Sequence, residues 1–288
     1  MRDHDYTPAM TCLGTLPSTT SAMPESGWAD LETELDIWHS TGCTVNFWWR
    51  DDDAVTWTPA LQRLLELAED VPIGVAVIPG EARTELVRSL EVRGRAAVLQ
   101  HGWRHTNHAG RDEKKSELGG TRPLRQRLDE LAAGRDRLAS LFGDRALPIL
   151  VPPWNRIGED LIPELPALGF RGLSMGSIPP LGRREKLPII GPLKRAETPS
   201  VPGLRQVHVH IDLIDWHGTR GFVGKSIALS LMLRHLGDRR RHGIKEPIGI
   251  LTHHLVQDAE TDDFLRRLFG ILRRHRAVRL APIPELFA

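Results

Sequence analysis

The sequence predicts an α/β fold, a single distorted (β/α) barrel of about seven parallel strands. Short, continuously apolar segments alternate along the 288-residue chain with amphipathic segments of helical period. Such apolar strands are typical of a parallel sheet covered by helices. Polar clusters also follow directly after five of the apolar segments. Since the active site of a (β/α) barrel gathers at the carboxyl ends of its strands, the clusters favour a barrel enzyme.

Each element is predicted from its own residues. The apolar, strand-like segments are 44–49, 73–79, 96–100, 147–151, 171–175, 205–212, 248–252 and 277–283. The segments with apolar residues at helical spacing are 28–42, 59–71, 81–94, 122–143, 225–241 and 262–275. Residues 159–169 contain two prolines and are predicted to form a broken helix.

Composition limits the domain organisation and the partners. Residues 1–26 are rich in Ser, Thr and Pro, so we expect a mobile N-terminal tail before one barrel domain over residues 27–288. The formal net charge of +1 favours neither nucleic acid nor a membrane surface as a partner. With no signal peptide or transmembrane segment recognisable, a cytoplasmic location is expected. The oligomeric state stays open.

Histidines are concentrated after the strand at 96–100. The segment LQHGWRHTNHAG contains His101 and His105, four residues apart, and then His108. Divalent metals bind neutral imidazole and carboxylate groups, and a catalytic site uses three protein ligands. The acidic triplet RDDDA, at the end of another strand, could supply the third ligand. Histidines in an ordinary polar loop are the alternative, and the charged stretch 110–122 is expected to be solvated or a lid.

The five clusters RDDDA, HGWRH, PPW, DLIDW and ILTH resemble the ordered motifs of the polysaccharide deacetylases, the NodB-homology group or carbohydrate esterase family four. The resemblance spans residues 47–254 and implies a distorted (β/α) barrel. It implies a metal-dependent deacetylase that acts on carbon–nitrogen bonds other than peptide bonds. The expected substrate is an N-acetylated or O-acetylated sugar or glycan, attacked by a metal-bound water. The implied cofactor is one divalent metal ion, expected to be Zn²⁺.

The resemblance also implies roles for the acidic triplet. When Ala54 is aligned with the small residue of the family's first motif, the resemblance makes Asp52 the general base and Asp53 the metal ligand. The other register would use Asp51 and Asp52, and the acid left over would cap a turn. In the preferred register the metal ligands are Asp53, His101 and His105.

Later motifs supply the remaining roles. The resemblance makes His253 the general acid and gives Asp215 a supporting role in the catalytic machinery. His210 and Asp212, earlier on the same strand, are expected to be structural. The residues expected to bind substrate are Trp154, Asn155 and Trp216.

The sequence departs from the family pattern at three positions. Val151 stands where the family has an arginine that orients the base, and Arg156 or Arg50 could fill that space. Gly102 stands where the family has Ser or Thr, and His254 where it often has an acid. Two other functions stay open: hydrolysis of another small non-peptide C–N bond on the same metal site, and a catalytically silent carbohydrate-binding barrel.

Overall fold

The computed structural model describes residues 27–67, 70–91, 96–120, 122–176 and 199–288. The tail expected over residues 1–26 lies outside these ranges. Within them, no helix combines the length and the apolar character needed to cross a membrane.

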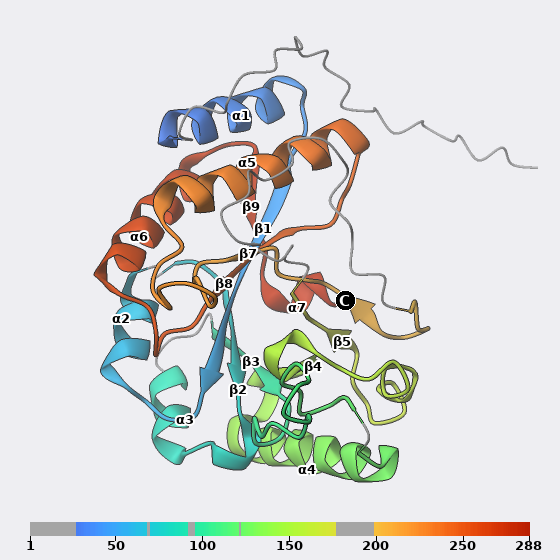
Figure 1. The fold of residues 1–288 in the computed structure, drawn as a ribbon. Helices are drawn as coiled ribbons and strands as arrows, with labels where there is room; N and C mark the ends of the chain where they lie inside the picture. Colours follow the sequence, from blue (N-terminus) through green and yellow to red (C-terminus); the bar gives the residue numbers. More distant parts are fainter. Residues whose placement is uncertain (1–26, 68–69, 92–95, 121, 177–198) are drawn as a thin grey trace, which may run out of the picture.

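The strands form one parallel sheet (Figure 1). They are β1 (Val45–Ala54), β2 (Ile73–Val77), β3 (Ala96–His101), β4 (Ala146–Val151), β5 (Gly172–Leu173), β6 (Arg205–Gln206), β7 (Ile211–Asp212), β8 (Ile248–Thr252) and β9 (Val278–Leu280). Their order is β6-β5-β4-β3-β2-β1-β8-β7, with β9 paired to β1, and each named pair is parallel. The long central β1 therefore carries the acidic triplet at its carboxyl end.

A single extended segment, residues 205–213, joins the two ends of this order. In its first half the N–H of Val209 donates to the Met175 carbonyl, just beyond β5 (2.9 Å). The next N–H, of His210, donates to the Gly249 carbonyl in β8 (2.8 Å). Because the segment pairs with one end of the sheet and then with the other, it closes the sheet. The predicted distorted barrel of about seven parallel strands is confirmed.

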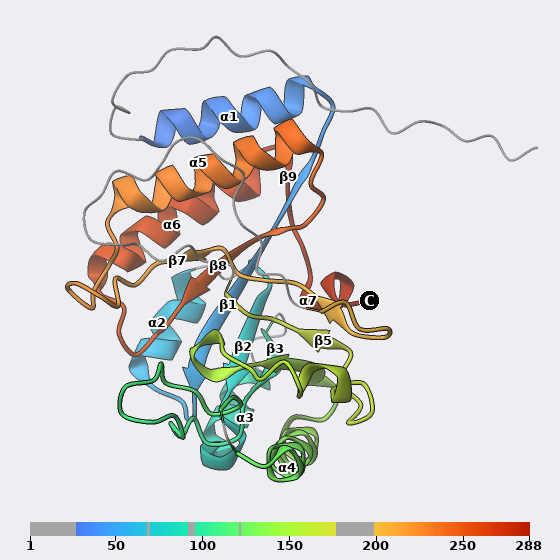
Figure 2. The same cartoon turned by 45° about the vertical axis from the view of Figure 1, so that its right-hand side comes forward.

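Helices surround the barrel. They are α1 (Trp28–Ser40), α2 (Pro59–Leu67), α3 (Thr84–Glu91), α4 (Leu124–Phe142), α5 (Lys225–His242), α6 (Ala259–Arg274) and α7 (Ile283–Leu286). In both cartoon views α1, α5 and α6 are stacked at one side, and α4 lies at the opposite side (Figures 1 and 2). The broken helix expected over residues 159–169 is wrong, because only a 3-10 turn forms at Ile162–Glu164. Pro163 and Pro166 lack the N–H groups that a helix needs there.

Alternation along β1 divides its side chains between two hydrophobic clusters. Trp49 packs against Phe269 of α6, with ring centroids 4.9 Å apart, in the cluster between the sheet and the helices. Trp48 packs against Phe287 (6.0 Å) in a second cluster, to which alternate residues of the other strands contribute. The alternation puts Arg50 on the same face as Trp48, so this arginine is fully buried inside the barrel.

A buried polar cluster joins α5 to His210, just before β7. The guanidinium of Arg239 contacts Nε2 of His210 (3.1 Å) and Nδ1 of His235 (3.0 Å). Because Arg239 only donates hydrogen bonds, Nδ1 of His235 accepts one. Burial, together with the charges of His210 and Arg239, lowers the pKa of His235 from 6.5 to about 2. His235 therefore stays neutral in the folded protein.

Because this imidazole stays neutral, we expect the folded protein to lose stability in acid. Below pH 6.5 the unfolded chain protonates His235 and the folded chain does not, so its contribution to stability is present above pH 6.5 and lost as the pH falls. One such proton gives a slope of about 1.4 kcal/mol per pH unit. His235→Gln keeps an acceptor for Arg239 but cannot titrate, and should show a shallower slope than the wild type.

Urea unfolding measured between pH 6.5 and pH 4.5 tests this prediction. Glu246, whose pKa falls from 4.5 to about 2, adds to the slope at the acid end of that window, but it does so in both proteins and cancels in their comparison. Equal slopes for the wild type and His235→Gln would contradict the prediction.

Candidate metal centre and active site

The end of β1 turns Asp53 out of the regular alternation. The backbone of Asp53 has a positive φ of 72°, and the register of β1 against β2 shifts between Asp51 and Ala54. This left-handed conformation is uncommon for residues other than glycine, although aspartate tolerates it better than most. The irregularity gives Asp53 a direction different from that of Asp51, two residues earlier.

Asp53 meets the two histidines of the HxxxH motif. Its Oδ1 lies 3.1 Å from Nε2 of His101 and 3.3 Å from Nε2 of His105. His101 ends β3, and a turn with left-handed residues at Gly102 and His105 brings the second imidazole back (φ 57° and 56°). One ligand atom from each of the three residues lies within 4.8 Å of the others, so the group could hold a metal ion. The structure thus brings together all three predicted ligands.

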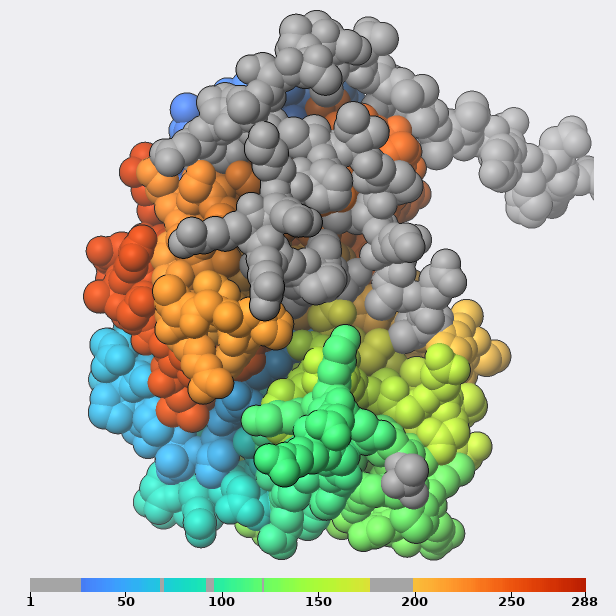
Figure 3. Space-filling view, viewed as in Figure 1, coloured from blue at the N-terminus to red at the C-terminus, as the bar shows by residue number. Residues whose placement is uncertain are grey.

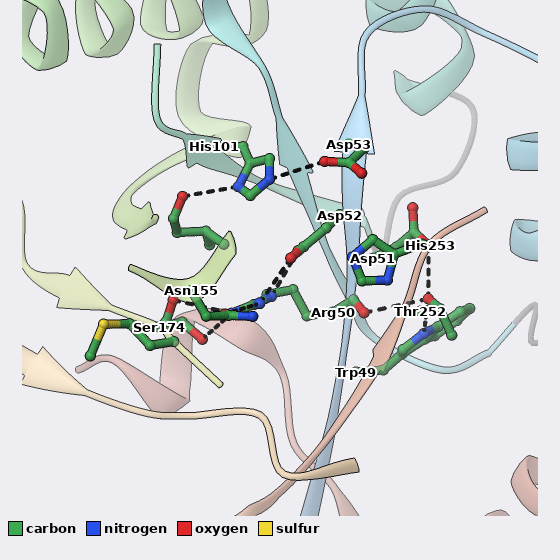
Figure 4. A network of polar contacts seen from close by, with 12 residues as sticks. Trp49, Arg50, Asp51, Asp52, Asp53, His101, Asn155, Ser174, Thr252 and His253 are labelled. Carbon is green, nitrogen blue, oxygen red and sulfur yellow. Dashed lines mark hydrogen bonds and ion pairs between the residues drawn. The ribbon is translucent and has the colours of Figure 1, made fainter. Parts of the chain in front are cut away.

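The hydrogen bond of His101 fits a metal site. Its Nδ1 lies 2.9 Å from the carbonyl oxygen of Val151, which can only accept (Figure 4). Nδ1 therefore carries a proton, and Nε2 is the nitrogen that faces Asp53. An N–H to a backbone carbonyl is the usual way in which proteins fix a metal-binding imidazole. The ring of Trp154 packs against His105, with centroids 4.2 Å apart, and limits its movement.

Charges within this group oppose the effect of burial on the pKa values of Asp53 and His101, and the charge of His101 adds to that effect at His105. Burial acts to raise the pKa of Asp53, but the hydrogen bond from His101 and the nearby imidazoles lower it overall. Burial acts to lower the pKa of His101, and the hydrogen bond to Asp53 with the charges of Asp52 and Asp53 raises it overall. Burial and His101 lower the pKa of His105. An ionised Asp53 and a neutral His105 are the protonation states that metal binding requires.

Asp52 lies beside this group and pairs with Arg50. Nε of Arg50 is 2.8 Å from Oδ1 of Asp52, and Nη2 is 2.9 Å from Oδ2 (Figure 4). The guanidinium also donates to Oδ1 of Asn155 (2.9 Å) and Oγ of Ser174 (2.8 Å). With five donors in a rigid plane, it fixes the carboxylate as well as neutralising it. Of the two arginines proposed to replace the missing one, Arg50 contacts Asp52, whereas Arg156 donates to the carbonyl at position 115.

The remaining acid of the triplet, Asp51, has other partners. Its fully buried carboxylate accepts hydrogen bonds from Oγ1 of Thr252 (2.8 Å) and from the backbone N–H of His254 (3.0 Å), and pairs with Nδ1 of His254 (2.6 Å). Burial acts to lower the pKa of His254, but the charge of Asp51 raises it overall. Asp51 thus joins β1 to the end of β8, which is more than the turn cap expected of a spare aspartate.

His253 follows β8 and lies against the DLIDW segment. Its Nδ1 is 3.9 Å from Oδ1 of Asp212, and its ring meets the ring of Trp216 at 82°, with centroids 4.7 Å apart. Nε1 of Trp216 donates to Oδ2 of Asp212 (2.8 Å), and burial raises the pKa of Asp212. The structure does not bring Asp215 to His253. The carboxylate of Asp215 instead accepts backbone N–H groups in its own loop, including that of Gly218 (3.0 Å).

Sequence reasoning missed three contributors to this site. Asp212 was expected to be structural, Ser174 was not considered, and Glu117 was part of a stretch expected to be solvated. Asp212 had a signal, because it lies four residues before Trp216 in the same motif. For Glu117 the sequence held only an indirect clue, which is Gly102. A glycine in place of Ser or Thr leaves space for another group.

Solved structures with this fold include sugar deacetylases. A Mycobacterium smegmatis protein assigned as a polysaccharide deacetylase superposes with a TM-score of 0.57 and 16% identity, over 85% of this chain and 89% of that one. A mutant of a carbohydrate esterase family 4 pseudoenzyme with restored enzymatic activity gives 0.53 and 14%, over 85% and 68%. A peptidoglycan N-acetylglucosamine deacetylase bound to an N-hydroxybenzamide gives 0.50 and 15%, over 85% and 88%.

Sequence comparison adds nothing to this likeness, since no protein-family model and no curated protein sequence matches the chain. At these identities the superpositions concern the fold, and they agree with the parallel order and closure of the sheet. The chain therefore has the distorted (β/α) barrel fold of the family 4 carbohydrate esterases and polysaccharide deacetylases.

Proposed function

We propose that this chain is a metal-dependent deacetylase that hydrolyses an acetyl group on an N-acetylated or O-acetylated sugar or glycan. The observation that carries the proposal is the Asp53–His101–His105 group beside the buried Arg50–Asp52 pair. The barrel fold that the chain shares with sugar deacetylases supports it.

Asp53, His101 and His105 would hold one divalent metal ion. Two imidazoles and one carboxylate suit Zn²⁺ and leave a position open for water or substrate. When bound, the ion would lower the pKa of a water molecule and polarise the acetyl carbonyl.

Two other side chains would move protons. Asp52, held by Arg50, would take a proton from the water that attacks the acetyl carbonyl. As the C–N bond breaks, His253 would protonate the departing amine, so that acetate and an amino sugar result. In an O-acetyl substrate the alcohol oxygen would receive that proton. Arg50 and Asp212 would be positioning residues, Arg50 for the base and Asp212, in the role first given to Asp215, for the imidazole of His253.

Three residues would form the substrate groove. Trp216 is 40% exposed and lies against His253, so it could offer a face to the apolar side of a sugar ring. Trp154 lies against His105, with ring centroids 4.2 Å apart. The side-chain oxygen of Asn155 is used by Arg50, which leaves its NH₂ group to donate to substrate.

Acetate release tests this function. The purified protein, loaded with Zn²⁺, is expected to release acetate from at least one member of a panel of N-acetylated and O-acetylated sugars and oligosaccharides. A chelator should abolish release and added Zn²⁺ should restore it. Tight glycan binding without release would favour the silent carbohydrate-binding barrel, although Arg50 removes the main argument for it. Turnover of other small amides alone would favour the alternative C–N hydrolase.

A further inference from the structure

We propose that Glu117 is a positioning residue for the two histidines of the metal centre. The inference rests on the proposed function, because it concerns the turn that carries His101 and His105. Glu117 lies on the loop that follows β3. This loop is drawn in green in Figure 3 and projects from the molecular surface. Its own side chain nevertheless points inward and is only 1% exposed.

The carboxylate of Glu117 accepts three backbone N–H groups of the HxxxH turn. Oε2 accepts from Trp103 (2.9 Å), and Oε1 accepts from Arg104 (2.7 Å) and Thr106 (3.3 Å). These residues lie between and just after the two imidazoles, so one side chain fixes the backbone on which His105 depends. The three hydrogen bonds are partly buried, so leaving these N–H groups without an acceptor would be costly, and three of them need two acceptor oxygens. A carboxylate meets this need, whereas a glutamine offers only one oxygen.

Gly102 is required by the same contact. A Cβ atom at Gly102 would lie 2.0 Å from Oε2 of Glu117 and 2.6 Å from Cγ of Pro153, both closer than atoms can approach. The positive φ of Gly102 (57°) also favours glycine. The resemblance to the deacetylases places Ser or Thr here. In this chain Glu117 fills the space that such a side chain would need, and Gly102 is the residue that admits it.

The backbone around Glu117 is itself anchored. The carbonyl of Ser116 accepts the N–H of His108 (2.9 Å), and the carbonyl of Leu118 accepts the N–H of Gly158 (3.0 Å). The carbonyl of Glu117 accepts from Nη1 of Arg122 (3.1 Å). Glu117 is therefore a fixed support that joins the body of the barrel to the histidine turn.

Metal affinity, measured by competition with a chromophoric chelator for Zn²⁺, tests the proposal. Glu117→Gln should weaken Zn²⁺ binding about tenfold or more, in the range found when groups that orient metal ligands are removed. Glu113→Gln is the matched control, because Glu113 is an exposed glutamate of the same loop that accepts one N–H, from Gly110 (2.9 Å). It should leave the affinity within about twofold of the wild-type value, well below the effect of losing an orienting group.

Outcomes separate this inference from the proposed function. Wild-type protein that binds Zn²⁺, with unchanged affinity in a folded Glu117→Gln variant, would overturn the role of Glu117 alone. Wild-type protein that binds no Zn²⁺ would overturn both.

Gly102→Ala, which keeps Glu117 but displaces its carboxylate, covers the case in which Glu117→Gln does not fold, and unchanged Zn²⁺ affinity in this variant would overturn the proposal. A double-mutant cycle then isolates the contact. Gly102→Ala should weaken Zn²⁺ binding strongly when Glu117 is present and much less in the Glu117→Ala background, because the collision with Oε2 is then absent. The clash with Pro153 is the same in both backgrounds and cancels. Equal effects of Gly102→Ala in the two backgrounds would overturn the proposal.

Discussion

Replacing Asp52 with asparagine is expected to lower kcat about 10²–10⁴-fold, the usual contribution of a general base, while the protein keeps its metal ion. Asparagine has nearly the shape of aspartate but cannot accept a proton from water. Asp52 pairs with Arg50, whereas Asp53 alone of the triplet belongs to the Asp–His–His group. Acetate release and bound Zn²⁺, measured on the same preparation, check both parts of the prediction.

The other two acids of the triplet provide the controls. Asp53→Asn should lose Zn²⁺. Asp51→Asn should mainly lower stability, because Asp51 holds the end of β8 through Thr252 and His254. Loss of the metal in Asp52→Asn and its retention in Asp53→Asn would show that the other register of the triplet is correct.

The double replacement His101→Ala with His105→Ala should abolish the binding of about one divalent ion per chain. Both remaining donors would then come from one carboxylate, which cannot hold Zn²⁺ tightly without further protein ligands. Elemental analysis after dialysis against buffered Zn²⁺ measures the loss. Added Zn²⁺ should also no longer raise the melting temperature, since a ligand stabilises only the state that binds it.

His108→Ala is the matched control, because His108 lies in the same loop and is exposed. It should keep both the metal and the effect of metal on the melting temperature. Unchanged metal content in the double variant would show that the ion binds elsewhere.

The architecture could be predicted where a local pattern determines the structure. Continuous apolar runs marked the five longest strands, and helical spacing marked α1 to α6. The segment 205–212 was recognised as a strand, but its pairing with both ends of the sheet depends on contacts with residues far along the chain. The broken helix expected at 159–169 shortened to a 3-10 turn, because the two prolines there interrupt the hydrogen bonds of a helix more than was expected.

The site shows the same limit. The spacing of His101 and His105 is local, so the sequence reveals both, and the acidic triplet at the end of another strand supplies a carboxylate partner. Arg50 contacts Ser174, which lies 124 residues away in the sequence, and no local pattern predicts that contact. Asp212 and Asp215 are three residues apart in one motif, and only the turn after β7 decides which of them faces His253.

The positive φ angles of Asp53 and His105 have an evolutionary consequence. Each non-glycine residue held in the left-handed region costs on the order of 1–2 kcal/mol, and here both belong to the group that we assign to the metal. A population selected for stability alone would drift toward glycine or asparagine at positions 53 and 105, and would lose the ligands as it gained stability. Aspartate at position 53 and histidine at position 105 thus oppose the direction in which folding alone would take the sequence.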